Sequence, residues 1–99
     1  MTISLKPVAL PDFGIPLERP AIPAETYASR CAAAFERSKA DWMAVYADRE
    51  HFANISFLTG FEPRFEEALL LLGPNGRKIV ITGNENQGYA PILPLAGLE

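Results

Sequence analysis

The sequence contains few of the residues that build metal sites. It has one histidine, His51, and one cysteine, Cys31, among 99 residues. Catalytic zinc commonly takes three protein ligands. His51 follows Glu50, but a H-E-x-x-H motif would require a second histidine at position 54 or 55, where Asn54 and Ile55 stand. We therefore expect no metal or other cofactor to be held by this chain.

The chain also lacks the motifs of an activated nucleophile and of nucleotide binding. No serine lies in a G-x-S-x-G pattern, and the glycine spacings match neither the phosphate loop nor the dinucleotide fingerprint. Cys31 falls on the apolar side of a predicted helix and has no identifiable basic partner, so we interpret it as a small core residue. A self-contained active site is not expected, and we predict no catalytic residue in this chain.

Neither a basic cluster nor a long apolar run is present. Nine Lys and Arg residues are scattered among 12 acidic ones, for a net charge of -3, which argues against a nucleic-acid partner. The longest apolar run, residues 42–47, is far shorter than the roughly 20 residues of a membrane span. The first residues lack the apolar region of a signal peptide, and a lone cysteine fits a reducing compartment. We predict a cytoplasmic protein with no membrane partner.

Composition and length are those of one globular domain. Apolar residues make up 48% and charged residues 21% of the chain, as in ordinary soluble domains, and the length suits a single domain. Residues 1–22 are predicted to be an extended arm, because prolines recur along it and disfavour helix. The arm nevertheless carries apolar side chains without periodicity. It either lies across its own domain, another domain or another subunit, or it is a floppy terminus.

The order helix, strand, helix, strand, strand predicts an α/β fold, a small mixed sheet with flanking helices. The first helix is predicted to begin at Pro23, which suits the first helical position. Asp48 is predicted to cap a second helix over residues 49–58 that ends at Gly60. Residues 42–47 and 67–72 are apolar at both odd and even positions, which predicts strands buried on both faces.

A hairpin is predicted around residues 73–76, Gly-Pro-Asn-Gly. Proline suits the second position of a type I turn, asparagine the third, and Gly76 a left-handed residue that leads into a bulge. The third strand then covers residues 78–82. Beyond a polar turn at residues 84–89, Pro91 and Pro94 predict an extended tail.

The loop over residues 61–66 is the candidate site. It contains two aromatic residues, an arginine and two acids, which could form an aromatic-walled pocket in which Arg64 meets a carboxylate. The alternative is that Phe61 and Phe65 pack at the edge of the core while Arg64 pairs with a nearby acid.

Residues 54–61, Asn-Ile-Ser-Phe-Leu-Thr-Gly-Phe, resemble a signature in the N-terminal domain of the creatinase, prolidase and aminopeptidase P family, Asn-x-x-Tyr-Leu-Thr-Gly-Phe. The apolar segment before it, the leucine-rich segment after it and the Gly-Pro-x-Gly turn agree with that family, and the resemblance covers roughly residues 23–83. Phe57 stands where the family often has tyrosine, so a role of that hydroxyl is not carried over.

The resemblance implies a ribonuclease H-like domain over residues 23–99, with the remaining strands and a C-terminal catalytic domain expected beyond it. It implies the non-catalytic N-terminal domain of a metal-dependent Xaa-Pro peptidase, whose two divalent ions (manganese, cobalt or zinc) are held by that catalytic domain. The expected partners are the catalytic domain, a second subunit in a homodimer, and a peptide or small-molecule substrate. Phe61, Arg64 and Phe65 are then the candidates for lining the substrate pocket.

Two other classes stay open. One is a catalytically inactive module of the same fold that binds peptides or a protein partner. The other is an unrelated small α/β enzyme, for which the sequence offers no nucleophile or ligand set.

Overall fold

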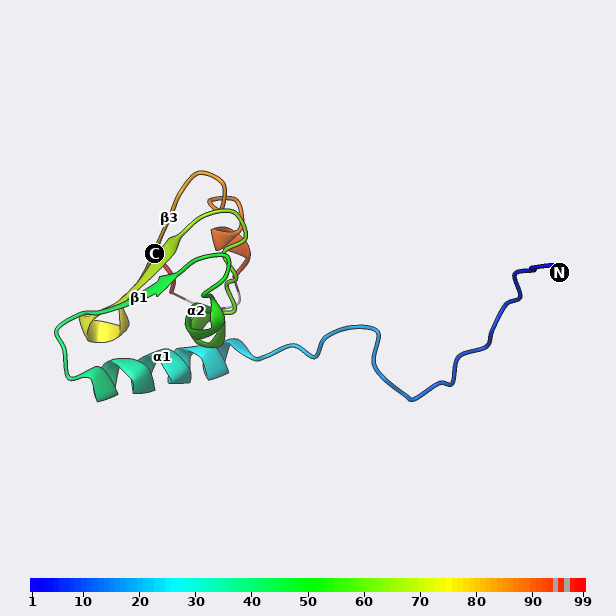
Figure 1. Ribbon diagram of the computed structural model, residues 1–99. Coiled ribbons are helices and arrows are strands. Elements are labelled where there is room, and N and C mark those ends of the chain that lie inside the picture. Colours follow the sequence, from blue (N-terminus) through cyan, green and yellow to red (C-terminus); the bar gives the residue numbers. More distant parts are fainter. Residues whose placement is uncertain (94, 96) are drawn as a thin grey trace.

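The computed structural model describes residues 1–93, 95 and 97–99. Figure 1 shows a small sheet with both helices on one side of it and the N-terminal arm running away from the body. The small α/β architecture with flanking helices is therefore confirmed. The elements are α1 (Ala24–Ser38), β1 (Met43–Ala47), α2 (Ala53–Thr59), β2 (Ala68–Leu72), η1 (Pro74–Gly76), β3 (Lys78–Thr82) and η2 (Ala90–Ile92).

The three strands form an antiparallel sheet in the order β1-β2-β3. Val45 of β1 lies opposite Leu70 of β2, which lies opposite Val80 of β3. Within the described residues, parallel pairing is limited to an isolated bridge between Lys78 and Leu98. A mixed sheet is the expectation from the sequence, but the three strands are antiparallel throughout.

The core lies between the sheet and the two helices. Alternate strand residues point toward the helices, and Leu70 at the centre of β2 is fully buried. Helix α1 contributes Tyr27 and Cys31, and α2 contributes Ile55 and Leu58. The remaining core residues are Val45, Ala47, Phe61, Ala68, Leu72 and Leu95.

The opposite face of the sheet carries apolar side chains but no covering layer among the described residues. We call it the open face, and it consists of Ala44, Tyr46, Leu69, Leu71, Ile79 and Ile81. Tyr46 is 57% exposed and Ile81 52%. The prediction that the strands are buried on both faces is therefore wrong in this structure, because both helices pack on the same side (Figure 1).

The helix boundaries correct two predictions. Pro23 lies at the N-cap, one residue before α1, with φ -59° and ψ 146°. Helix α2 begins at Ala53 and not at residue 49. Asp48 does accept hydrogen bonds from the amides two and three residues on, but the Asp48 N–H also donates to the His51 carbonyl at 3.1 Å, which closes a separate turn before the helix. The end of α2 at Gly60 is confirmed.

The hairpin turn has a different geometry from the predicted type I turn. Asn75 has φ 59° and Gly76 φ 73°, and the Arg77 N–H donates to the Pro74 carbonyl at 3.3 Å. Positive φ at both central residues is the property of a type I′ turn, for which Asn-Gly is the preferred pair. Its twist matches the twist of the flanking strands, which explains why it replaces the type I form.

The segment after β3 folds back on the sheet. Ala90–Ile92 forms a short 3-10 helix, so the predicted extended tail is wrong around Pro91, and Pro94 lies outside the described residues. The Val80 N–H donates to the Glu99 carbonyl at 2.8 Å, and the Glu99 N–H donates to the Lys78 carbonyl at 2.7 Å. The outer edge of β3 is thereby partly paired.

The arm, residues 1–22, has no helix or strand and extends away from the body (Figure 1). It gives the molecule a length of 72 Å against 30 and 22 Å in the other directions. Its large apolar side chains are exposed, including Val8 at 80% and Leu10 at 85%. Within residues 1–93, 95 and 97–99, neither helix combines the length and apolarity that crossing a bilayer requires.

Candidate functional site

The residues of the family-like octapeptide build the end of α2. The buried Thr59 hydroxyl donates to the Ile55 carbonyl at 2.7 Å and accepts from the Phe61 N–H at 3.0 Å. Gly60 adopts φ 78° and its N–H donates to the Ser56 carbonyl at 2.8 Å. A left-handed residue at this place is least strained as glycine. Together Thr59 and Gly60 turn the chain sharply, so that Phe61 enters the core.

Side chains of α1 satisfy the last carbonyls of α2. The Arg30 guanidinium donates to the Phe57 carbonyl at 2.9 Å, and the Cys31 thiol donates to the Leu58 carbonyl at 3.2 Å. The guanidinium also lies 4.1 Å from the centroid of the Phe57 ring, a cation–π distance. Phe57, at the position where the family often has tyrosine, therefore packs on Arg30 of α1.

Cys31 has the surroundings of a core residue. It is 3% exposed, and burial raises the pKa of its thiol. A raised pKa lowers the thiolate fraction at neutral pH, and the thiolate is the nucleophilic form. The burial of Cys31 among core side chains confirms its interpretation as a small core residue.

The loop over residues 61–66 divides its three candidate residues between the core and the surface. Phe61 is 2% exposed. The Arg64 side chain is 72% exposed, and its Nη2 lies 3.4 Å from the Glu62 carboxylate. Phe65 is 61% exposed, with its ring centroid 6.2 Å from that of Tyr89. The structure thus places Arg64 and Phe65 on the surface and Phe61 beneath them, and their role in substrate binding stays a prediction.

A hollow of about 290 Å³ lies beside Phe65. Its walls come from the turn after β1 and from the segment that leads into β2, and they are lined by Asp48, Arg49, Glu50, Phe65, Glu66 and Glu67. The sequence analysis did not bring these two segments together. The signal appears only in the strand pairing, because Ala47 opposite Ala68 brings residue 48 alongside residue 67.

Asp48, an acid of this hollow, accepts several hydrogen bonds. Its carboxylate accepts from the amides of His51 and Glu50, at 2.6 and 2.9 Å, and from the Tyr46 hydroxyl at 3.0 Å. Chiefly the His51 amide bond lowers the pKa of Asp48 to about 2. The hydrogen bond to Asp48 in turn raises the pKa of Tyr46. Asp48 is therefore ionised at neutral pH and fully engaged in its own turn, which makes it a poor general base.

Glu66 holds the turn that follows β3. One of its carboxylate oxygens accepts from the Asn86 N–H at 2.9 Å, and Gly83 lies against the same carboxylate. Asn86 is 1% exposed, and its side-chain oxygen has no hydrogen-bond partner among the described residues. Glu66 therefore links the segment before β2 to the turn after β3.

Neither metal-ligand clustering nor comparison with known proteins identifies a chemistry for this site. Within the described part of the chain, no group of three or more His, Cys, Asp and Glu residues is arranged to hold a metal ion. Comparisons with family models, with curated proteins and with solved structures give no match.

Proposed function

We propose that the chain is a non-catalytic N-terminal domain of a metal-dependent Xaa-Pro peptidase of the creatinase, prolidase and aminopeptidase P type. The observation that carries the proposal is the octapeptide at residues 54–61. Its Thr59, Gly60 and Phe61 act as one unit that ends α2 and directs the following loop. A signature with such a joint structural role is better support than a chance match of eight letters.

The proposed domain is of the ribonuclease H-like type and works in the cytoplasm as part of a larger assembly. Its open face is apolar and uncovered among the described residues, which suits packing against a catalytic domain or a second subunit. Arg64 and Phe65 stand on the surface loop, from which they could reach a substrate held by a neighbouring domain.

The described residues include no cluster of ligands that fits the two-metal centre that the family uses. The Asp48 carboxylate is occupied by the amides of its turn, and the Glu66 carboxylate by Asn86. We assign the metal ions to the separate catalytic domain, and we assign no catalytic step to a residue of this chain.

An activity assay tests the non-catalytic role. The purified chain, mixed with Mn²⁺ and an Xaa-Pro dipeptide, is expected to release no proline, while an active prolidase under the same conditions releases it. Turnover by the purified chain, retained through a second purification step, would overturn the proposal.

Kinetics of a full-length enzyme that carries this domain test the role of the loop. Arg64→Ala is expected to raise KM several-fold, roughly the effect of losing one charged contact of about 1 kcal/mol. Arg37→Ala, in the last turn of α1 and exposed, is the matched control and should leave KM unchanged. Equal kinetics for the Arg64→Ala enzyme and the wild type would remove Arg64 from the substrate pocket.

The alternative is a catalytically inactive module that binds peptides or a protein partner. The observation that favours it is the hollow beside Phe65, whose acidic lining suits the amino group or a basic side chain of a peptide. Titration of the chain with a Lys-containing proline peptide, monitored by amide NMR shifts, tests this alternative. Shifts at Phe65 and Glu67 would support the module, and their absence at millimolar peptide would exclude it.

A further inference from the structure

The outer edge of β1 has backbone groups without a hydrogen-bond partner among the described residues. The Gly73 N–H donates to the Arg77 carbonyl at 2.9 Å, and antiparallel partners alternate between bonded and non-bonded pairs. It follows that the backbone N–H and C=O groups of Leu69 and Leu71 are hydrogen-bonded to β3. Those of Leu70 and Leu72 are hydrogen-bonded to β1. Val45 therefore bonds inward, and the N–H and C=O groups of Ala44 and Tyr46 point outward.

The outer edge of β3 supports this assignment. The same alternation predicts that Lys78 and Val80 bond away from β2, and both do bond to Glu99. The outer edge of β3 is thus already hydrogen-bonded to Glu99. The edge of β1 has no strand beside it among the described residues.

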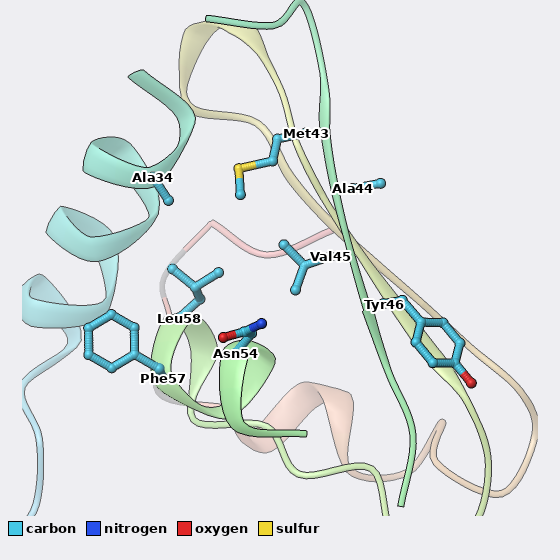
Figure 2. A pocket seen from close by; sticks show the side chains of 8 residues that line it. All are labelled: Ala34, Met43, Ala44, Val45, Tyr46, Asn54, Phe57 and Leu58. Carbon is cyan, nitrogen blue, oxygen red and sulfur yellow. The ribbon is translucent and has the colours of Figure 1, made fainter. Parts of the chain in front are cut away.

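An apolar groove runs beside the free edge of β1. It has a volume of about 420 Å³ and lies between β1 and the two helices. Figure 2 shows Met43 and Val45 pointing into it, toward Ala34 of α1 and Leu58 of α2, while Tyr46 points away. A free strand edge beside a pocket for alternate side chains is the arrangement that accepts an added strand: the backbone supplies affinity and the pocket supplies selectivity.

Residues 5–13 of the arm have the sequence of a strand that can pair along one edge only. Pro7 and Pro11 are both at odd positions, whereas Val8 and Leu10 are at even positions. In an extended chain the backbone groups of alternate residues point to opposite sides, so within residues 5–13 both missing N–H groups fall on the odd side. The other prolines of the arm, Pro16 and Pro20, lie at even positions after Gly14. The even side of residues 5–13 keeps all its N–H donors. The odd side is blunted by proline, which is how natural proteins protect an edge from further pairing.

The arm also has a defined end. The Asp12 carboxylate accepts from the Gly14 N–H at 2.8 Å, and Gly14 has φ 70°. This turn stops an extended segment at about residue 13. The arm points away from its own body (Figure 1), so residues 5–13 lie far from the groove beside their own β1.

We propose that residues 5–13 of one copy add as a strand to the free edge of β1 in a second copy. In a strand added parallel to β1, the residues that bond to Ala44 and Tyr46 lie opposite residues whose side chains are on the same face as Val45. Val8 and Leu10 are then on that face, and both side chains enter the groove. Two copies exchange arms about a two-fold axis, which closes the assembly as a dimer. Pro7 and Pro11 then line the outer side and prevent a third strand from joining. The proposal concerns this chain by itself, without the further strands that the peptidase role expects for this sheet, and it is tested on this chain.

Proline substitution tests the alternation directly. The chain of 10.8 kDa is expected to elute as a dimer by size-exclusion chromatography with light scattering. Val8→Pro removes an N–H that faces β1 and should weaken dimerisation about tenfold or more, the effect of roughly 1.4 kcal/mol. Ala9→Pro removes an N–H that faces solvent and should leave the dimer intact. A wild-type monomer at all concentrations, or equal effects of the two substitutions, would overturn the proposal.

Mixing two defective full-length variants distinguishes exchange from docking within one copy. Ala34→Glu places a charge in the groove but keeps the arm, whereas Val8→Pro keeps the groove. At a concentration at which the wild type is dimeric but a dimer weakened about tenfold is not, each alone is expected to be monomeric, with the amide NMR spectrum of a folded domain. Their equimolar mixture should form a heterodimer through the one intact arm–groove pair. A mixture that stays monomeric would contradict exchange between copies.

Discussion

At the scale of single residues, Thr59 is a buried polar group with a structural task. Its hydroxyl both caps the last turn of α2 and receives the Phe61 N–H. We expect Thr59→Val to lower the free energy of unfolding by about 1–3 kcal/mol, because the Phe61 N–H is left buried without a partner. Urea denaturation would measure the difference.

The matched control for Thr59 is Thr82→Val on β3. Thr82 is only half-buried and its hydroxyl has no hydrogen bond among the described residues, so its replacement should change stability by less than about 0.5 kcal/mol. Equal stability of the Thr59→Val variant and the wild type would show that the signature threonine is not needed for this fold.

Asp48 gives the molecule a pH-dependent contribution to stability. The hydrogen bonds of its turn lower its pKa to about 2 in the folded state, against an ordinary value of 3.8. A lowered folded-state pKa means that the stabilisation is fully present above pH 3.8 and is lost as the pH falls toward 2.

Replacement of Asp48 by a residue that does not titrate exposes this contribution. The stability difference between wild type and Asp48→Asn is expected to shrink as the pH is lowered from 3.8 to about 2. Asp41→Asn, in the exposed turn before β1, is the control. A difference that stays constant over this range in thermal unfolding would contradict the assigned pKa.

At the scale of elements, the ring of Trp42, the residue before β1, packs on the hairpin turn between β2 and β3. A Cβ added to Gly73 would overlap the ring of Trp42, and the Arg77 guanidinium lies 5.4 Å from the centroid of that ring. We expect Gly73→Ala to cost about 1–3 kcal/mol, because the ring must leave the backbone against which it packs.

Fluorescence reports on this change directly, since Trp42 is the single tryptophan. Its emission should shift to the red in Gly73→Ala. Gly88→Ala is the control, because a Cβ there meets nothing within 4 Å. Unchanged emission and stability in Gly73→Ala would mean that the ring does not rest on the hairpin.

The sequence predicted the positions of helices, strands and turns more accurately than it predicted which segments lie against one another. Gly60 and the Asn75–Gly76 turn carry their own conformational signal, and both stand where expected, although the turn is of the primed type. The start of α2 was misplaced because Asp48 can cap a turn as well as a helix. The hollow beside Phe65 could not be predicted, since it arises only when the turn after β1 is set against the entry of β2.

At the scale of the whole molecule, the described residues cover one side of the sheet, whereas its strands carry apolar side chains on both sides. Leu70 is fully buried against the helices, while its neighbour Leu71 on the open face is half-buried. The alternation of side chains along a strand places these neighbours in different environments. A pair of identical substitutions can therefore reveal which faces are covered in solution.

Leu70→Ala is expected to lower the free energy of unfolding by about 2–5 kcal/mol, because it leaves a cavity in the core. Leu71→Ala should cost less than about 1.5 kcal/mol, since a half-exposed side chain loses less burial energy. Urea denaturation of both variants at low micromolar concentration makes the comparison. If Leu71→Ala costs as much as Leu70→Ala, the open face is covered in solution. A dependence of that cost on protein concentration would then identify the cover as a second copy of the chain, because only an intermolecular contact follows mass action.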